Sequence, residues 1–187
     1  GIEGANGASL KSKGGLQGGA AVTLGRGPLH FETGLFYASR GAKLENIYSN
    51  LNVGQTSSLD FTLHYLDIPV LARYTTSLAS NLKFYAHGGA VLGFLQDSKV
   101  EYKSNPTQYS FMSPVSTSTS GDDYFHKFDT RLLAGVGGAW SVSRSLSLTG
   151  ALDYQLGVTT VNTDQLANGY DAYNSSLGLN IGLKLDI

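Results

Sequence analysis

Hydrophobic and polar residues alternate without a break along the last part of the chain. From Ser176 to Ile187, Leu or Ile stands at every second position, and Ser, Gly, Asn, Lys or Asp stands between them. Successive side chains of a β-strand point to opposite faces, so one face of this strand is apolar and the other is polar or small. Such a strand fits a wall between lipid and water.

The same alternation recurs earlier in the chain and predicts further strands. They cover residues 16–24, 29–40, 61–74, 82–94, 127–140 and 146–158, and residues 1–6 look like the end of one more. Pro69 indicates a bulge or an unpaired amide within its strand. Bacterial barrels have even numbers of strands, with about eight as the minimum. We therefore predict an all-β fold, an eight-stranded antiparallel transmembrane β-barrel, as one domain over residues 1–187.

Short and long connections alternate between these strands. The short ones lie near Gly25, Thr75 and Ser141, and the long ones cover residues 41–58, 97–123 and 162–172. Short periplasmic turns and long extracellular loops are typical of bacterial outer-membrane barrels. We therefore expect the bacterial outer membrane as the location, with both chain termini on the periplasmic side. An outer-membrane protein needs a signal segment, so Gly1 is expected to begin a processed or trimmed chain.

Composition agrees with a membrane wall. Charged residues make up 14% of the chain, against about 25% in ordinary soluble domains. No apolar run approaches the roughly 20 residues of a membrane-spanning helix, so a membrane crossing would require a closed sheet.

The net charge of −1 argues against nucleic-acid binding, and the absence of cysteine excludes disulfides and thiolate sites. The alternative is a lipocalin-like soluble barrel with an apolar cavity, whose exterior would then be poor in charge.

Charged residues and one histidine fall on the polar face of the predicted strands. They are Glu32, Arg40, Asp67, Arg73, Lys83, His87, Lys127, Asp129, Arg131, Asp153 and Lys184. The interior of a barrel of about eight strands is just wide enough for side chains to fill, so we expect these charges to pair and close the lumen. A narrow channel is the alternative, and its currents would change when Arg131 or Asp129 is neutralised.

Aromatic residues fall near both ends of the predicted strands, where interfacial girdles lie in barrels. Tyr74, Phe84 and Trp140 stand near the short turns, and Tyr37, Phe94 and Tyr154 stand nearer the long loops. Anchoring in the bilayer, in contact with outer-membrane lipid and lipopolysaccharide, is the expected role. A platform that stacks on a ligand is the alternative.

Catalysis is a third hypothesis, because His64, His87 and His126 are predicted at the loop-rich end or in the lumen, with Asp129 close in sequence to His126. A lipid-modifying enzyme would need a hydroxyl, a base and an orienting group in hydrogen-bond reach. Ser and Thr are too frequent here for sequence proximity to identify such a set. The four histidines lack the spacing of zinc sites. We therefore expect no enzyme activity, no metal and no cofactor.

The segment from Ser104 to Gly121 has no charged residue and contains the apolar side chains of Tyr109, Phe111 and Met112. Loops on a rigid barrel commonly carry function. This segment is therefore a candidate contact with a partner protein of the cell envelope, and a disordered loop tip is the alternative.

Three segments carry a family resemblance. The run from Tyr65 to Tyr74, YLDIPVLARY, is preceded by YASRGAKL at residues 37–44, and the glycine-rich LAGVGGA follows at 133–139. Together they resemble the small outer-membrane β-barrels of Bacteroidetes-type bacteria that are called PorT-like or porin-family. Members commonly end on an aromatic residue, whereas this chain ends on Ile187. The resemblance implies an eight-stranded barrel with an accessory role in a larger secretion, insertion or nutrient-uptake assembly, and implies little about activity. Adhesion is a further hypothesis for its work.

Overall fold

The architecture comes from a computed structural model, which describes residues 2–3, 9–45, 55–106, 115–120, 125–161 and 173–185. Every regular element in these ranges is a β-strand. No helix among the described residues is long and apolar enough to cross a membrane.

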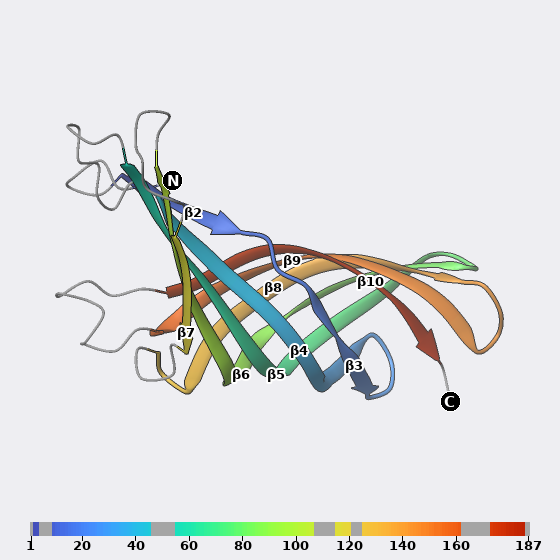
Figure 1. Cartoon of the computed structure of the whole chain (residues 1–187). Helices are drawn as coiled ribbons and strands as arrows, with labels where there is room; N and C mark the ends of the chain where they lie inside the picture. The colour runs from blue at the N-terminus through green and yellow to red at the C-terminus, as the bar shows by residue number, and fades with distance from the viewer. Residues whose placement is uncertain are drawn as a thin grey trace. The chain divides into compact units, whose positions relative to one another are not determined.

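The strands form one antiparallel sheet (Figure 1). They are β1 Ile2–Glu3, β2 Ser9–Lys13, β3 Gln17–Leu24, β4 Leu29–Glu45, β5 Gln55–Ala79, β6 Leu82–Pro106, β7 Val115–Ser120, β8 Phe128–Ser141, β9 Leu146–Thr160 and β10 Tyr173–Leu185. Hydrogen-bonded neighbours follow the order β1-β2-β4-β5-β6-β8-β9-β10, while β3 pairs with β4 and β7 pairs with β6.

Two positions in the sheet are each occupied by two successive strands. β2 pairs with residues 41–45 of β4, and β3 pairs with β4 as well. In the same way β7 pairs with residues 99–104 of β6, whereas β8 pairs with residues 82–94. The order of neighbours therefore contains eight strands, and the predicted all-β fold of eight antiparallel strands is confirmed.

Strands extend further than the alternation of residues predicts. β4 ends at Glu45, β5 begins at Gln55 and β6 ends at Pro106, so the predicted long connections 41–58 and 97–123 are partly strand. β2 and β7 were not predicted, and β7 consists of Val, Ser and Thr. Backbone hydrogen bonds hold these segments in the ladder without an apolar face, so a search for apolar alternation misses them. Residues 162–172 lie outside the described ranges.

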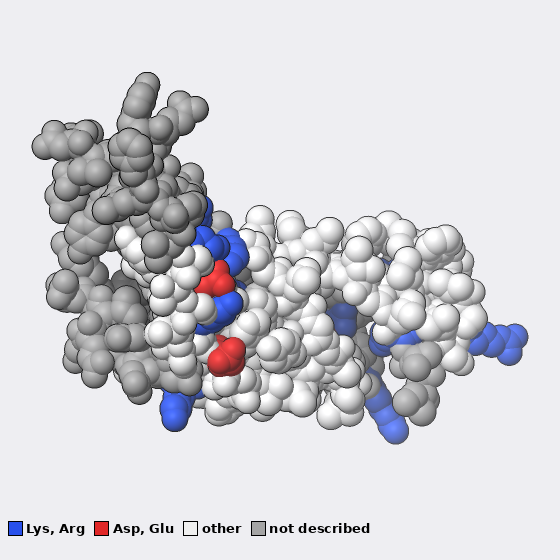
Figure 2. Space-filling view, in the orientation of Figure 1, with Lys and Arg blue, Asp and Glu red and all other residues white. Residues whose placement is uncertain are grey.

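Most large exposed side chains are apolar, whereas the buried side chains include charged as well as apolar ones. In β8, Asp129 and Arg131 are fully buried, whereas Leu132 and Val136 are more than half exposed. β9 repeats this pattern along its length. A soluble barrel with an apolar cavity would show the opposite arrangement, so the lipocalin-like alternative is wrong. Figure 2 agrees, since uncharged side chains make up most of the described surface in that view.

The chain divides into two compact units, which we describe separately. Unit 1 comprises residues 1–18, 37–66 and 95–127, and unit 2 comprises residues 19–36, 67–94 and 128–187. The core of unit 1 contains Leu63, Tyr65 and Phe125. Phe125 meets the ring of Phe61 edge-on at 6.0 Å between centroids. This unit therefore has an apolar core of its own.

Unit 2 has two small apolar clusters. One consists of Leu71, Val91 and Leu133, from β5, β6 and β8. The other consists of Tyr85, Ala139 and Ala151, from β6, β8 and β9. Buried charged side chains lie on the same strands, and they form the candidate site.

Candidate functional site

Arg131 is the centre of a fully buried group of charges in unit 2. Its guanidinium donates a short hydrogen bond to Asp67 Oδ1, and its Nε lies 3.1 Å from Asp129 Oδ2. A second guanidinium nitrogen donates to Gln155 Oε1 at 3.1 Å. Asn174 Nδ2 and Thr159 Oγ1 donate to the carboxylate of Asp129, at 2.8 and 3.2 Å. The two acids and the arginine are thus held by each other and by neutral donors and acceptors.

A glycine makes this contact possible. Arg131 is on β8 and Asp67 is on β5, with β6 between them, and adjacent strands are about 4.8 Å apart. Gly93 of β6 occupies the intervening position. A Cβ there would stand 2.6 Å from the Arg131 Nη2 and 3.1 Å from Asp67 Oδ1. The missing side chain of Gly93 therefore leaves the space in which the two charged groups meet.

A second polar group surrounds His87. His87 Nε2 lies 2.8 Å from Asp153 Oδ1, and Asn180 Nδ2 donates to Asp153 Oδ2 at 2.6 Å. On the other side of the ring, His87 Nδ1 is 4.0 Å from Glu32 Oε1. Glu32 also forms an ion pair with Arg73. The histidine is thus placed between two carboxylates, and a guanidinium balances one of them.

The geometry of the first group is repeated here. His87 is on β6 and Asp153 is on β9, and Gly135 of β8 is the register partner of both. A Cβ on Gly135 would collide with the His87 ring and with the Asp153 carboxylate. Glycine on the polar face is therefore what lets ionisable side chains two strands apart form pairs.

Charged and apolar side chains succeed each other along the inner face of unit 2. In order along β6 stand Lys83, Tyr85, His87, Val91 and Gly93. Tyr85 and Val91 belong to the two apolar clusters, and His87 and Gly93 belong to the two polar groups. The interior of this unit is therefore filled in layers that differ in polarity.

Unit 1 carries a different set of charges, close to the surface. Lys99 Nζ donates to Glu101 Oε1 at 2.6 Å, and Lys103 Nζ lies 3.0 Å from Glu101 Oε2. Lys103 also donates to Asp60 Oδ2 at 2.8 Å. A transmembrane strand needs about 9–11 residues, and the part of β6 that pairs with β8, residues 82–94, already supplies that length without residues 99–103.

Glu101 is expected to titrate far below its usual range. Hydrogen bonds from Lys99 and Lys103 lower the pKa of Glu101 from 4.5 to about 2. Because the pKa falls on folding, this pairing stabilises the folded chain above pH 4.5 and is lost as the pH falls toward 2. Carboxyl ¹³C NMR should find this low pKa for Glu101 in the wild-type protein. In Lys99→Met and in Lys103→Met, the pKa of Glu101 should be higher. Lys13→Met is the control, since Lys13 bonds to Thr62. A wild-type midpoint near 4.5 would contradict the prediction.

The structure brings many of the residues predicted for the lumen together. Glu32, Asp67, Arg73, His87, Asp129, Arg131 and Asp153 form the two groups described above. Lys83 and Lys184 line a cavity of unit 2. Arg40 lies in unit 1, with its guanidinium 5.5 Å from the centre of the Tyr65 ring. Lys127 is exposed and precedes β8, and its place in the lumen stays a prediction.

The predicted interfacial aromatic residues are exposed. Tyr37, Tyr74, Phe84, Phe94, Trp140 and Tyr154 are between 38% and 55% accessible. Their place on the outer, apolar face is what anchoring in a bilayer requires, and their role as anchors stays a prediction. Tyr109, Phe111 and Met112 of the candidate partner loop lie outside the described residues.

The three histidines considered for catalysis have different surroundings. His64 is stacked on Tyr37 at 5.6 Å, His126 is exposed, and His87 is in the interior of unit 2. Within the described ranges there is also no group of three or more His, Asp or Glu side chains arranged to hold a metal ion.

Several polar partners were missed from the sequence. Gln155, Thr159, Asn174 and Asn180 complete the two groups, and Asp60 completes the surface cluster. The first four are neutral, and Asp60 precedes the predicted strand 61–74. A search restricted to charged residues on predicted strands therefore does not find them. The alternation does place Gln155 on the same face as Asp153, which is the signal that could have identified it.

An antiparallel sheet with an apolar outside and a polar, filled inside defines a membrane-spanning β-barrel. The comparison with known families agrees. Residues 3–162 match the family described as outer membrane protein beta-barrel domain, which is most of the chain. The chain belongs to this family and is an outer-membrane β-barrel protein. No curated protein and no solved structure matches it.

Proposed function

We propose that this protein is a non-enzymatic outer-membrane barrel that works through its outward surfaces, as a scaffold or accessory subunit of an envelope assembly or as an adhesin. Secretion, outer-membrane protein insertion and nutrient uptake are the assemblies that we consider. The observation that supports this proposal is that alternating polar groups and apolar clusters fill the interior of unit 2. Its buried acids are already bound to Arg131, Arg73, His87 and neutral donors, which leaves the exterior for recognition.

A narrow channel is less well supported. A conducting path needs a continuous polar lining, whereas the apolar clusters around Val91 and Tyr85 alternate with the polar groups along the same strands. A lipid-modifying enzyme is also less well supported, because the carboxylate of Asp153 is engaged by both His87 and Asn180.

The proposed orientation follows the rule for bacterial outer-membrane barrels, with the short turns in the periplasm and both termini on that side. The segment from Ser104 to Gly121 would then face the outside, and Tyr109, Phe111 and Met112 would contact a partner protein. Outer-membrane lipid and lipopolysaccharide would cover the apolar outer face. The YLDIPVLARY run supports a place among the PorT-like barrels of Bacteroidetes-type bacteria.

Purification of the tagged protein from mildly solubilised native outer membranes tests this function. We expect a stoichiometric partner that is identified by mass spectrometry, with a heat-modifiable barrel band on the same sample. A triple variant in which Tyr109, Phe111 and Met112 are each changed to Ala should reduce partner recovery at least about tenfold, since aromatic anchors dominate binding energy. The matched control replaces Thr117 and Thr119 of the exposed strand β7 with Ala and should keep the partner. A barrel that is always recovered alone contradicts the scaffold and subunit roles and favours an autonomous adhesin, channel or enzyme.

A further inference from the structure

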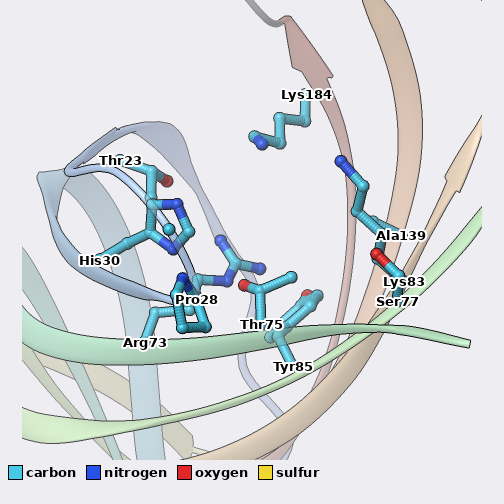
Figure 3. A pocket seen from close by; sticks show the side chains of 11 residues that line it. Thr23, Pro28, His30, Arg73, Thr75, Ser77, Lys83, Tyr85, Ala139 and Lys184 are labelled. Carbon is cyan, nitrogen blue, oxygen red and sulfur yellow. The ribbon is translucent and has the colours of Figure 1, made fainter.

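Unit 2 has a cavity of about 330 Å³ beside its short turns, which shares Arg73 with the second polar group (Figure 3). Gly27 and Pro28 of the turn between β3 and β4 form part of the wall, and Ser77 contributes from the end of β5. Thr23 of β3 and Lys184 of β10 also line it, so both the first and the last strand of this unit contribute to one site. This volume lies in the lower part of the usual range for small-molecule sites.

Basic side chains dominate the charge of this cavity. Lys83, Lys184, Arg73 and His30 line it, and no Asp or Glu is among its described lining residues. Arg73 is balanced by Glu32 outside the lining and lies over the Tyr85 ring, with its Cζ 3.5 Å from the ring centre. The two lysines come from different strands, and their side chains lie around the same space in Figure 3. A walled space with this charge concentrates anions.

Neutral donors complete the lining. Thr23, Thr75 and Ser77 add hydroxyl groups. The Nδ1 atom of His30 is buried and has no hydrogen-bond partner among the described residues. An unsatisfied buried ring nitrogen costs free energy unless a ligand or water meets it. The cavity thus offers several donors in addition to its positive charge.

We propose that this cavity binds a phosphate group of a small phosphorylated ligand. A phosphate monoester carries close to two negative charges and three acceptor oxygens, which matches two ammonium groups and the surrounding hydroxyl and ring donors. A carboxylate has one charge and two oxygens, and would leave more of these donors unsatisfied. The volume beyond the phosphate accepts a small organic group. The phosphate monoester can belong to a soluble ester or to a phospholipid that ends in one, as phosphatidic acid does.

Calorimetric titration of the refolded whole chain in uncharged detergent and phosphate-free buffer tests this site. The probes are glycerol 3-phosphate and, separately, dihexanoyl phosphatidic acid, which both carry a phosphate monoester. We expect saturable 1:1 binding of at least one probe. Binding of glycerol 3-phosphate alone supports a soluble ester as the ligand, and tighter binding of the lipid supports a headgroup.

Charge-neutral variants locate the binding. Lys83→Gln and Lys184→Gln should each weaken the affinity about tenfold to a hundredfold, as expected for a lost charge-assisted hydrogen bond. Arg144→Gln removes one positive charge from the exposed short turn between β8 and β9 and should keep the wild-type affinity. Heat modifiability of each variant shows that it is folded, and either lysine variant suffices if the other does not fold. No saturable binding of either probe, or an equal loss in Arg144→Gln, overturns the proposal.

Discussion

Replacement of Arg131 with Met is expected to lower the free energy of unfolding by about 3–5 kcal/mol, the usual cost of removing one partner from a buried ion pair. Arg131, Asp67 and Asp129 are all fully buried. Without the guanidinium, Asp67 loses its short hydrogen bond and two carboxylates remain beside each other without a cation. Urea unfolding in lipid vesicles measures the change, and Trp140, the single tryptophan of the chain, reports on it by fluorescence.

Two further variants show whether the loss comes from the buried charges. Arg144→Met removes an arginine from an exposed turn and should change the free energy of unfolding by no more than about 0.5 kcal/mol. Asp67→Leu combined with Arg131→Met removes both members of one pair and leaves Asp129 bonded to Asn174 and Thr159. The double variant should therefore be more stable than Arg131→Met alone, because it leaves one buried carboxylate without a cation instead of two. An Arg131→Met protein as stable as the wild type would contradict the buried network.

The faces of the strands were predictable from the sequence, but the pairs were not. Period-2 alternation assigns Asp67, Arg131 and Asp153 to the polar side because a membrane wall requires it. Whether Arg131 meets Asp67 depends on strand register and on Gly93 in the strand between them, and neither is visible in the alternation. The start of β8 was mispredicted by one residue for a related reason. Lys127 continues the alternation, although the strand begins at Phe128.

Strands with polar residues on both faces also could not be predicted from the sequence pattern. The serines and threonines of β7 and the SLKSK of β2 carry no apolar period, yet their backbones pair with β6 and β4. Lipid imposes the alternation only where the wall crosses the bilayer. Beyond it, long-range backbone pairing determines the strand ends. The ion cluster around Glu101 was missed for this reason, since it lies on a part of β6 that was predicted to be loop.

A single arginine in the middle of the outer face should destabilise the barrel in a bilayer. Leu152 of β9 is 49% exposed, and its register neighbours are Val136 of β8 and Leu179 of β10. These three residues form an apolar row across the outer face. Leu152→Arg is expected to lower the free energy of unfolding in phosphatidylcholine vesicles by about 2–4 kcal/mol, the cost of a charge on the lipid face near the bilayer midplane.

The control for this prediction is the same substitution at the edge of the bilayer. Val142 follows the end of β8 and is 61% exposed in the turn before β9, so Val142→Arg should cost only about 0–1 kcal/mol in the same vesicles. The difference between the two variants measures depth in the membrane, because both replace an exposed aliphatic side chain with the same cation. Equal losses would show that lipid does not contact the row through Leu152.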